Sequence, residues 1–187
     1  MEKQLILASQ SARRKELLAK IGIPFSVDAA DIDETIDFSK PIREEIQHLA
    51  YRKAKTVFTR HPDGVVIGSD TVVVLDQEVL GKPKNNRDAE QMLRRLSGRV
   101  HQVITGLCIL SSLRCHQEVS VAEVTFASLS EEEIHAYVSG GEPMDKAGAY
   151  AIQGKGACFI TGIQGDFYTI VGLPVQRVYM ELKSGGY

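Results

Sequence analysis

The first residues with types suited to a chemical task lie close to the start of the chain, at 9–14 (SQSARR). A short apolar run precedes them and a helical pattern follows, so they occupy a predicted strand-to-helix junction. A helix N-terminus offers unpaired N–H groups and a positive dipole end, and arginine forks bind phosphate in bidentate fashion. Ser9, Arg13 and Arg14 are therefore candidate anion ligands. The alternative is a simple Ser11 N-cap followed by two solvated arginines.

A single carboxylate lies within the most β-branched part of the sequence. Asp70 belongs to the block GSDT at 68–71, between the apolar runs 65–68 and 72–75. A carboxylate in such surroundings is costly to bury unless it is paired or bound to a metal. We predict two strand runs interrupted by the polar residues, with Asp70 facing a polar cleft beside Thr71. There Asp70 can act as a general base on water or hold Mg²⁺, whereas capping a bulge is the alternative.

Two later segments combine glycine with charge. Lys82 lies in LGKP at 80–83, which is first of all a turn and secondly a candidate phosphate contact. Residues 143–154 (PMDKAGAYAIQG) are rich in small side chains that let a backbone approach a ligand closely. Asp145, Lys146 and Gln153 supply polar groups there. An ordinary surface loop is the alternative for this second segment.

Two further charged residues, Lys53 and Glu34, are expected by themselves to be exposed to solvent. Lys53 lies four residues after Leu49, on the apolar-leaning side of a predicted helix, and snorkelling to solvent is its default. Glu34 ends the acidic run 31–34 (DIDE), which by itself indicates a solvated loop.

These residues must be positioned by a mixture of helices and strands. Apolar periodicity, caps and turn residues predict both kinds of element without strict alternation. Ser130 and Glu133 form a capping box, and Gly165–Asp166 is typical of a hairpin turn. The predicted helices cover about 12–21, 41–61, 86–96, 130–140 and 175–183, and the predicted strands 4–8, 25–29, 65–68, 72–75, 78–80, 100–110, 118–127, 156–164 and 167–171.

No linker composition divides the chain, so we predict a single domain over residues 1–187 with an α/β (mixed α+β) architecture. We expect a long, partly antiparallel sheet flanked by helices. Two lobes around a cleft are compatible with the same pattern.

Composition excludes several classes of protein. The net charge of −2, from 22 Lys+Arg and 24 Asp+Glu, and the absence of tryptophan argue against a nucleic-acid-binding module. No run approaches the roughly 18 apolar residues that cross a bilayer. Cys108, Cys115 and Cys158 are widely spaced, which predicts buried or semi-buried free thiols rather than disulfides or a zinc site. We therefore expect a soluble cytoplasmic protein with no membrane or nucleic-acid partner.

Taken in order, the blocks LILASQSARRKELL, DIDE, LAYRKAK, GSDTVV, LGKP, MLRRLSG, EPMDKAGAYAIQG and VGLPV resemble the Maf family of nucleotide pyrophosphatases. They extend over nearly the whole chain. The block DKAGAYAIQG resembles the branch that acts on dTTP and UTP. The resemblance implies an elongated Maf/Ham1-like (ITPase-like) mixed α/β fold, with two lobes around a deep nucleotide-binding cleft, and a homodimer.

The resemblance also implies roles at matching positions. Asp70 would be the proton acceptor, while Arg13, Thr71 and Gln153 would determine selectivity. The remaining implied cleft residues are Ser9, Arg14, Glu34, Lys53, Lys82 and Asp145.

The expected reaction is hydrolysis of a nucleoside triphosphate to the monophosphate and pyrophosphate by attack of water on the α-phosphorus. Mg²⁺ or Mn²⁺ would bridge the phosphates to Glu34 and Asp70, because carboxylates suit hard cations. Whether Asp70 is base, ligand or both stays open. Gln153 both donates and accepts, which matches the O4 and N3–H pattern of thymine or uracil.

Two alternatives remain. One is a pyrophosphatase of the same reaction class acting on 7-methyl-GTP or a modified nucleotide. The other is a nucleotide-binding regulator of septation with little turnover. Asp70 and Glu34 argue against a pure binder, which needs the cations but not the acids.

Overall fold

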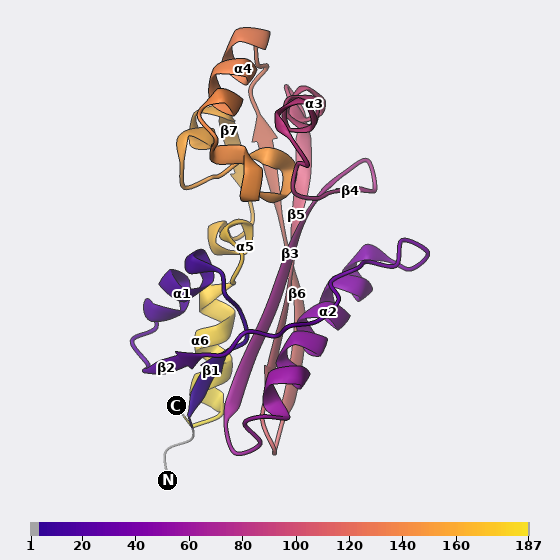
Figure 1. The fold of residues 1–187 in the computed structure, drawn as a ribbon. Helices are drawn as coiled ribbons and strands as arrows, with labels where there is room; N and C mark the ends of the chain where they lie inside the picture. Colours follow the sequence, from indigo (N-terminus) through magenta and orange to yellow (C-terminus); the bar gives the residue numbers. More distant parts are fainter. Residues whose placement is uncertain (1–3, 187) are drawn as a thin grey trace. The chain divides into compact units, whose positions relative to one another are not determined.

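The computed structural model describes residues 4–186. Its helices and strands follow one another along the chain without strict alternation (Figure 1). The helices are α1 (Ala12–Ala19), α2 (Ile42–Phe58), α3 (Asn86–Leu96), α4 (Glu131–Ser139), α5 (Phe167–Val171) and α6 (Val175–Ser184), with short 3₁₀ turns η1 (Glu142–Asp145), η2 (Ala147–Ala149) and η3 (Lys155–Phe159). The strands are β1 (Leu5–Leu7), β2 (Phe25–Val27), β3 (Val65–Leu75), β4 (Glu78–Leu80), β5 (Val100–Leu110), β6 (Cys115–Phe126) and β7 (Ile160–Gln164).

The strands form one mixed sheet in the order β2-β1-β3-β5-β6-β7, with β4 paired to β3. β1 lies between β2 and β3 and is parallel to both, whereas β4 is antiparallel to β3 and β7 is antiparallel to β6. Only four residues, 111–114, join β5 to β6, and so short a connection requires an antiparallel pair. The predicted mixed, partly antiparallel sheet flanked by helices is confirmed.

The chain is divided into two compact units. The first contains residues 1–71, 105–120 and 171–187, and the second contains 72–104 and 121–170. Three of the boundaries fall inside β3, β5 and β6, so the chain passes between units within strands. This explains why the sequence shows no linker. None of the helices within residues 4–186 has the length and apolar character that crossing a membrane requires.

In the first unit, helices cover both faces of the sheet, with α2 on one face and α1 and α6 on the other (Figure 1). The apolar side of α2 is buried, as its helical periodicity predicts. Its close contact with the sheet depends on Gly68 of β3 and Gly106 of β5. A Cβ at Gly68 would lie 2.3 Å from the carbonyl oxygen of Ala50, and one at Gly106 would lie 2.4 Å from that of Ile46.

In the second unit, α3, α4 and the 3₁₀ turns pack around one apolar core. Ser130 caps α4 with the predicted capping box, in which the side chains of Ser130 and Glu133 each accept from the backbone N–H of the other. Phe126 and Tyr150 pack edge to face in this core, with ring centroids 4.8 Å apart.

The predicted interruption of the third strand is wrong. Residues 65–75 form one continuous strand, because each polar side chain at 69–71 finds a partner without leaving the ladder. Ser69 donates to the Gly172 carbonyl, Asp70 pairs with Lys53, and the Thr71 hydroxyl is bonded to that of Thr105.

The predicted hairpin at Gly165–Asp166 is also wrong, because a helix follows this pair. The Asp166 carboxylate accepts from the backbone N–H groups of Tyr168 and Thr169, which is the role of an N-cap, and α5 begins at Phe167.

The prediction for the thiols is partly wrong. All three cysteines are free within the described chain, but only Cys108 is buried, whereas Cys115 and Cys158 are exposed.

Candidate active site

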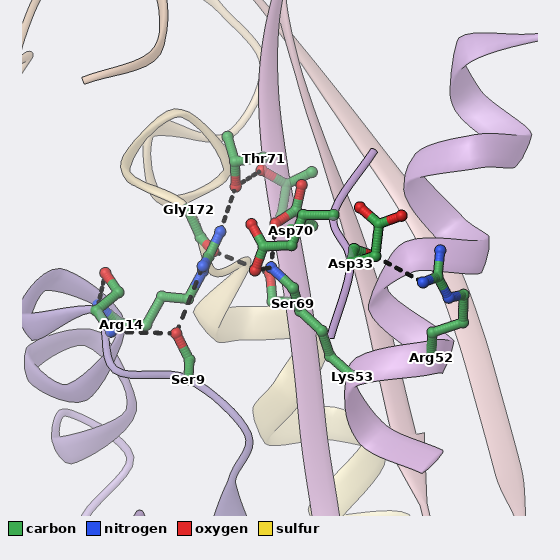
Figure 2. A network of polar contacts seen from close by, with 12 residues as sticks. Ser9, Arg14, Asp33, Arg52, Lys53, Ser69, Asp70, Thr71 and Gly172 are labelled. Carbon is green, nitrogen blue, oxygen red and sulfur yellow. Dashed lines mark hydrogen bonds and ion pairs between the residues drawn. The ribbon is translucent and has the colours of Figure 1, made fainter. Parts of the chain in front are cut away.

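Asp70 and Lys53 form the centre of the polar cluster in the first unit (Figure 2). Asp70 is in the middle of β3, and Lys53 is on the sheet-facing side of α2. Lys53 Nζ lies 2.5 Å from Asp70 Oδ1. The Lys53 side chain is only 7% exposed, so the expectation that it snorkels to solvent is wrong. A buried ammonium requires a paired anion, and Asp70 provides it.

The backbone brings these two side chains together. Strand side chains alternate between faces, so Gly68 and Asp70 lie on the same face of β3, the face that α2 covers. Since Gly68 has no side chain, the backbone of α2 at Ala50 and Ala54 packs directly on the strand. Lys53 lies between these two helix residues, and its side chain therefore reaches the Asp70 carboxylate.

Glu34 reaches the same ammonium from a separate segment of the chain. Its Oε1 lies 2.8 Å from Lys53 Nζ, and its side chain is 57% exposed. The backbone beside it is fixed by Arg52, whose Nη2 donates to the Asp33 carbonyl at 2.6 Å (Figure 2). Neighbouring residues of α2 thus hold neighbouring residues of the acidic segment, and two carboxylates converge on one cation.

Arg14 organises the opposite face of β3. Its Nε donates to the Gly172 carbonyl at 2.9 Å and its Nη2 to Thr71 Oγ1 at 3.1 Å. Ser69 also donates to the Gly172 carbonyl, at 3.0 Å, so this backbone oxygen joins α1 and β3 to the segment before α6. Gly172 adopts a φ of +122°, a conformation that L side chains rarely adopt.

The start of α1 contains the residues predicted to bind an anion. Ser11 is the N-cap, accepting from the Arg14 backbone N–H, and the first turn contains no acidic residue. Arg13 lies half-buried in that turn. Ser9 is buried, and its hydroxyl accepts from the Ser11 backbone N–H at 3.2 Å and from Arg14 Nη1. The predicted Ser11 cap is formed, but the two arginines are not simply solvated, because Arg14 is bonded to Ser9, Thr71 and Gly172 and Arg13 is half-buried.

Burial dominates the electrostatics of Arg14. Desolvation lowers the pKa of the Arg14 guanidinium, and the adjacent Arg13 lowers it further, while Asp70 and Glu34 oppose the shift. An arginine stays protonated at any physiological pH, so the lowered pKa reports that a charged guanidinium is held largely out of water. An arriving phosphate would offset that charge.

The predicted residues Lys82, Asp145 and Gln153 form a separate group within the second unit. The turn that carries Lys82 is bonded to the glycine-rich segment, because the Gly148 N–H donates to the Gly81 carbonyl at 3.1 Å. Asp145 ends η1 and its carboxylate is bonded to the adjacent Lys146 ammonium. Gln153 lies exposed after η2.

The structure therefore places seven of the predicted residues in the first unit and three in the second. Sequence reasoning missed Arg52, Thr105 and Gly172, which hold the charged groups in place. Arg52 and Gly172 lie inside the blocks LAYRKAK and VGLPV, but nothing in a sequence indicates that a backbone carbonyl is the useful group. The members of the first group are Ser9, Arg13, Arg14, Glu34, Lys53, Asp70 and Thr71, and those of the second are Lys82, Asp145 and Gln153.

The residues around Lys53 also suit a hard divalent cation. Asp70 and Glu34 already share one positive charge. Within residues 4–186 no group of three or more His, Cys, Asp or Glu side chains is placed to hold a metal. Mg²⁺ commonly takes one or two carboxylates and completes its shell with substrate phosphates and water. Two carboxylates therefore fit a metal that arrives with a phosphorylated substrate.

Comparison with known proteins agrees with the resemblance. The family model described as Maf-like protein matches residues 4–185. The "dTTP/UTP pyrophosphatase" of Symbiobacterium thermophilum is 50% identical, with 98% of this chain and 95% of the relative covered. That of Bacillus velezensis is 51% identical over 98% of this chain and 97% of the relative.

A solved structure agrees on the fold. The Staphylococcus aureus Ham1 protein is 13% identical with a TM-score of 0.57, and the match covers 98% of this chain and all of that one. At this identity the match concerns the fold alone, and it confirms the predicted Ham1-like class.

Proposed function

This chain belongs to the Maf-like protein family, and we propose that it is a nucleoside triphosphate pyrophosphatase whose substrates are dTTP and UTP. The products are the nucleoside monophosphate and pyrophosphate. The observation that carries the proposal is the convergence of Asp70 and Glu34 on the buried Lys53 ammonium, on a strand whose other face holds Arg14. A binding module needs the cations but has no use for the two acids.

The basic residues bind the triphosphate. The N–H groups at the start of α1 and the guanidinium of Arg13 provide donors and positive charge at one helix end. A guanidinium has five N–H donors, and three of those on Arg14 are engaged by Ser9, Thr71 and Gly172. Its remaining donors can contact phosphate while the side chain stays fixed. Lys82 supplies a further ammonium.

Asp70 is the general base. Its hydrogen bond to Lys53 uses one carboxylate oxygen, and the second oxygen can accept a proton from the attacking water. The water oxygen forms a bond to the α-phosphorus as the bond from that phosphorus to the bridging oxygen breaks, and pyrophosphate leaves with the bonding electron pair. Positive charge from Lys53, Arg13 and Arg14 stabilises the negative charge that develops on the phosphates.

Asp70 and Glu34 would hold Mg²⁺ or Mn²⁺ together with the substrate phosphates. When bound, the cation supplies Lewis-acid neutralisation of phosphate charge. The residues of the chain keep the roles described above.

Base selectivity is assigned to Gln153, with Arg13 and Thr71 as further selectivity positions. The Gln153 amide donates and accepts, which suits the O4 and N3–H edge of uracil or thymine. Asp145 is a further substrate contact. The three free cysteines support a cytoplasmic location, and a homodimer is expected from the family resemblance.

Pyrophosphate release from a panel of nucleoside triphosphates, with Mg²⁺ or Mn²⁺ present, tests the proposal. The panel contains dTTP, UTP, dCTP, the purine nucleotides and 7-methyl-GTP. We expect release from dTTP and UTP above all others, and a drop in kcat of about 10²- to 10⁴-fold in Asp70→Asn. Asp63→Asn, which changes an exposed turn residue, is the matched control.

Three results would count against this function. Tight nucleotide binding without release would identify a regulator instead. Preferred release from 7-methyl-GTP would reassign the substrate. Near-normal turnover in Asp70→Asn would remove Asp70 from the mechanism.

A further inference from the structure

The Glu142 carboxylate is the centre of a hydrogen-bond network within the second unit. Its Oε1 accepts from the Tyr137 hydroxyl at 2.8 Å and from the Gly156 N–H at 3.1 Å. Its Oε2 accepts from the Lys155 N–H at 3.0 Å. The Tyr137 hydroxyl in turn accepts from the Ala151 N–H at 3.1 Å. Through these bonds, α4 and η1 hold the backbone on both sides of Gln153.

The residues that follow Gln153 leave room for the Glu142 carboxylate. A Cβ on Gly154 would lie 2.5 Å from both Glu142 carboxylate oxygens. A Cβ on Gly156 would lie 2.9 Å from the Tyr137 hydroxyl and 2.9 Å from the Ala151 carbonyl. Both glycines of the block QGKG are therefore needed for the carboxylate and the phenol to fit beneath the loop.

The network has a definite protonation state. Burial opposes the charge on Glu142, yet the N–H groups of Lys155 and Gly156 and the Tyr137 hydroxyl hold its pKa below the usual range. Burial and the nearby carboxylate raise the pKa of Tyr137. The phenol therefore remains a donor and the carboxylate an acceptor near neutral pH.

A second anchor fixes the preceding part of the loop. The Tyr150 hydroxyl lies 2.8 Å from Nε2 of the buried His101, and the Tyr150 ring packs against His101 and Phe126. Gln153 itself is exposed, so its side chain gains no rigidity from packing. Its position depends on the backbone that these anchors hold.

We propose that Glu142 is a positioning residue for base selection, which fixes the amides of residues 151–156 and thereby sets where Gln153 presents its side chain. The inference rests on the proposed function, because it assumes that Gln153 reads the base. A recognition amide discriminates between bases only when its location is defined to within a fraction of an ångström. The hydrogen bonds to the N–H groups of Ala151, Lys155 and Gly156 fix the backbone on both sides of Gln153.

Glu142→Gln tests the inference with little change in shape. A glutamine replaces one acceptor oxygen with an NH₂ donor, which must then face at least one of the three donors that surround the carboxylate. Tyr137→Phe removes the phenol from the same network. Glu132→Gln, which changes an exposed position on α4, is the matched control.

The direct readout is amide hydrogen exchange of the segment 151–156 in the full-length protein. We expect exchange to become about three- to tenfold faster in Glu142→Gln and in Tyr137→Phe, as the loss of one hydrogen bond implies. Gln153→Ala should leave it unchanged.

The functional readout is the ratio of kcat/KM for dTTP to that for dCTP and dATP. We expect this ratio to fall by about three- to tenfold in Glu142→Gln, with a smaller change in kcat for dTTP. A purely structural role would lower the melting temperature and the amount of active protein without changing the ratio.

Two results would overturn the inference alone: wild-type exchange in Glu142→Gln, or faster exchange with an unchanged selectivity ratio. A wild-type protein that shows no preference among nucleotides would instead overturn the proposed function, and the role of Glu142 in selection with it.

Discussion

The Lys53 ammonium on α2 donates to the Asp70 carboxylate on β3, with Nζ 2.5 Å from Oδ1. The same nitrogen lies 2.8 Å from Glu34 Oε1. The buried Lys53 ammonium thus links Asp70 of β3 to Glu34, which lies in the segment before α2. This contact places the proposed base and the second acid side by side, and its loss would leave Asp70 as an unpaired carboxylate with 14% exposure.

Lys53→Met should therefore lower both turnover and stability. We expect kcat to fall by at least tenfold, and the free energy of unfolding to decrease by about 1–3 kcal/mol, because a largely buried charge loses its partner. Urea denaturation and pyrophosphate release measure the two effects. Lys55→Met, at an exposed position on the same helix, is the control and should change neither by more than a small factor. Wild-type turnover in Lys53→Met would show that the ion pair plays no part in the reaction.

Gly68→Ala should separate α2 from β3. The added methyl would lie 2.3 Å from the Ala50 carbonyl and 2.7 Å from the Ala54 nitrogen, both of which are backbone atoms that no rotamer change can move. We expect a destabilisation of about 1–3 kcal/mol or more, together with reduced turnover, since Lys53 moves with the helix.

The control for this substitution is Gly162→Ala in β7, where the nearest atom beyond the chain neighbours lies at 3.7 Å. Thermal unfolding and pyrophosphate release compare the two variants. Equal stability of both would mean that the close packing of α2 on Gly68 is unimportant.

Stability should decrease in acid through His101. Desolvation lowers the pKa of this buried histidine from 6.5 to about 4, so the unfolded chain binds a proton that the folded chain excludes between these values. The free energy of unfolding is therefore unaffected by His101 above about pH 6.5 and decreases progressively as the pH falls toward 4. The total decrease from this residue is about 3 kcal/mol.

Urea denaturation across this pH range measures the loss. His101→Gln, which offers Tyr150 a polar partner that does not titrate, should show a shallower decrease than the wild type. Parallel curves for the two proteins would assign the acid sensitivity to other groups.

Sequence signals that are contained within a few residues predict local structure well. The helix over 86–96 has the bounds that its apolar spacing predicts, and the capping box of Ser130 and Glu133 is formed. The predictions for β3 and α5 are wrong for different reasons, the first involving distant partners and the second a local cap that the sequence analysis missed. The polar residues 69–71 stay in the strand because partners distant in the sequence satisfy them, and Gly165–Asp166 begins a helix because Asp166 accepts two amides.

In the site, too, local sequence signals predict the residue types, whereas contacts between distant residues are not predicted. The charged residue types indicated phosphate chemistry, but the default for Lys53 was wrong, because the two missing facts are three-dimensional. One is the absence of a side chain at Gly68, which lets α2 pack on the strand, and the other is the Arg52 bond that fixes the acidic segment. The role of the Gly172 carbonyl as a shared acceptor has no sequence signal at all.

Gln153→Ala should relax base choice more than it slows hydrolysis of the preferred nucleotide. The Gln153 side chain is exposed, and the loop is held by bonds from the backbone N–H groups of Ala151 and Lys155 to Tyr137 and Glu142. Removing the Gln153 side chain therefore leaves this network in place. We expect the ratio of kcat/KM for dTTP to that for dCTP to fall about tenfold or more, with kcat for dTTP changed only a few-fold.

Measuring both constants for each nucleotide separates loss of discrimination from loss of turnover. Gln164→Ala, at an exposed position at the end of β7, is the matched control. If Gln153→Ala keeps the wild-type substrate profile, another residue reads the base, and Arg13 and Thr71 become the next positions to substitute. A fall in kcat for dTTP as large as that of Asp70→Asn would instead place Gln153 in the chemical step, because an interaction made only in the transition state lowers kcat and kcat/KM together.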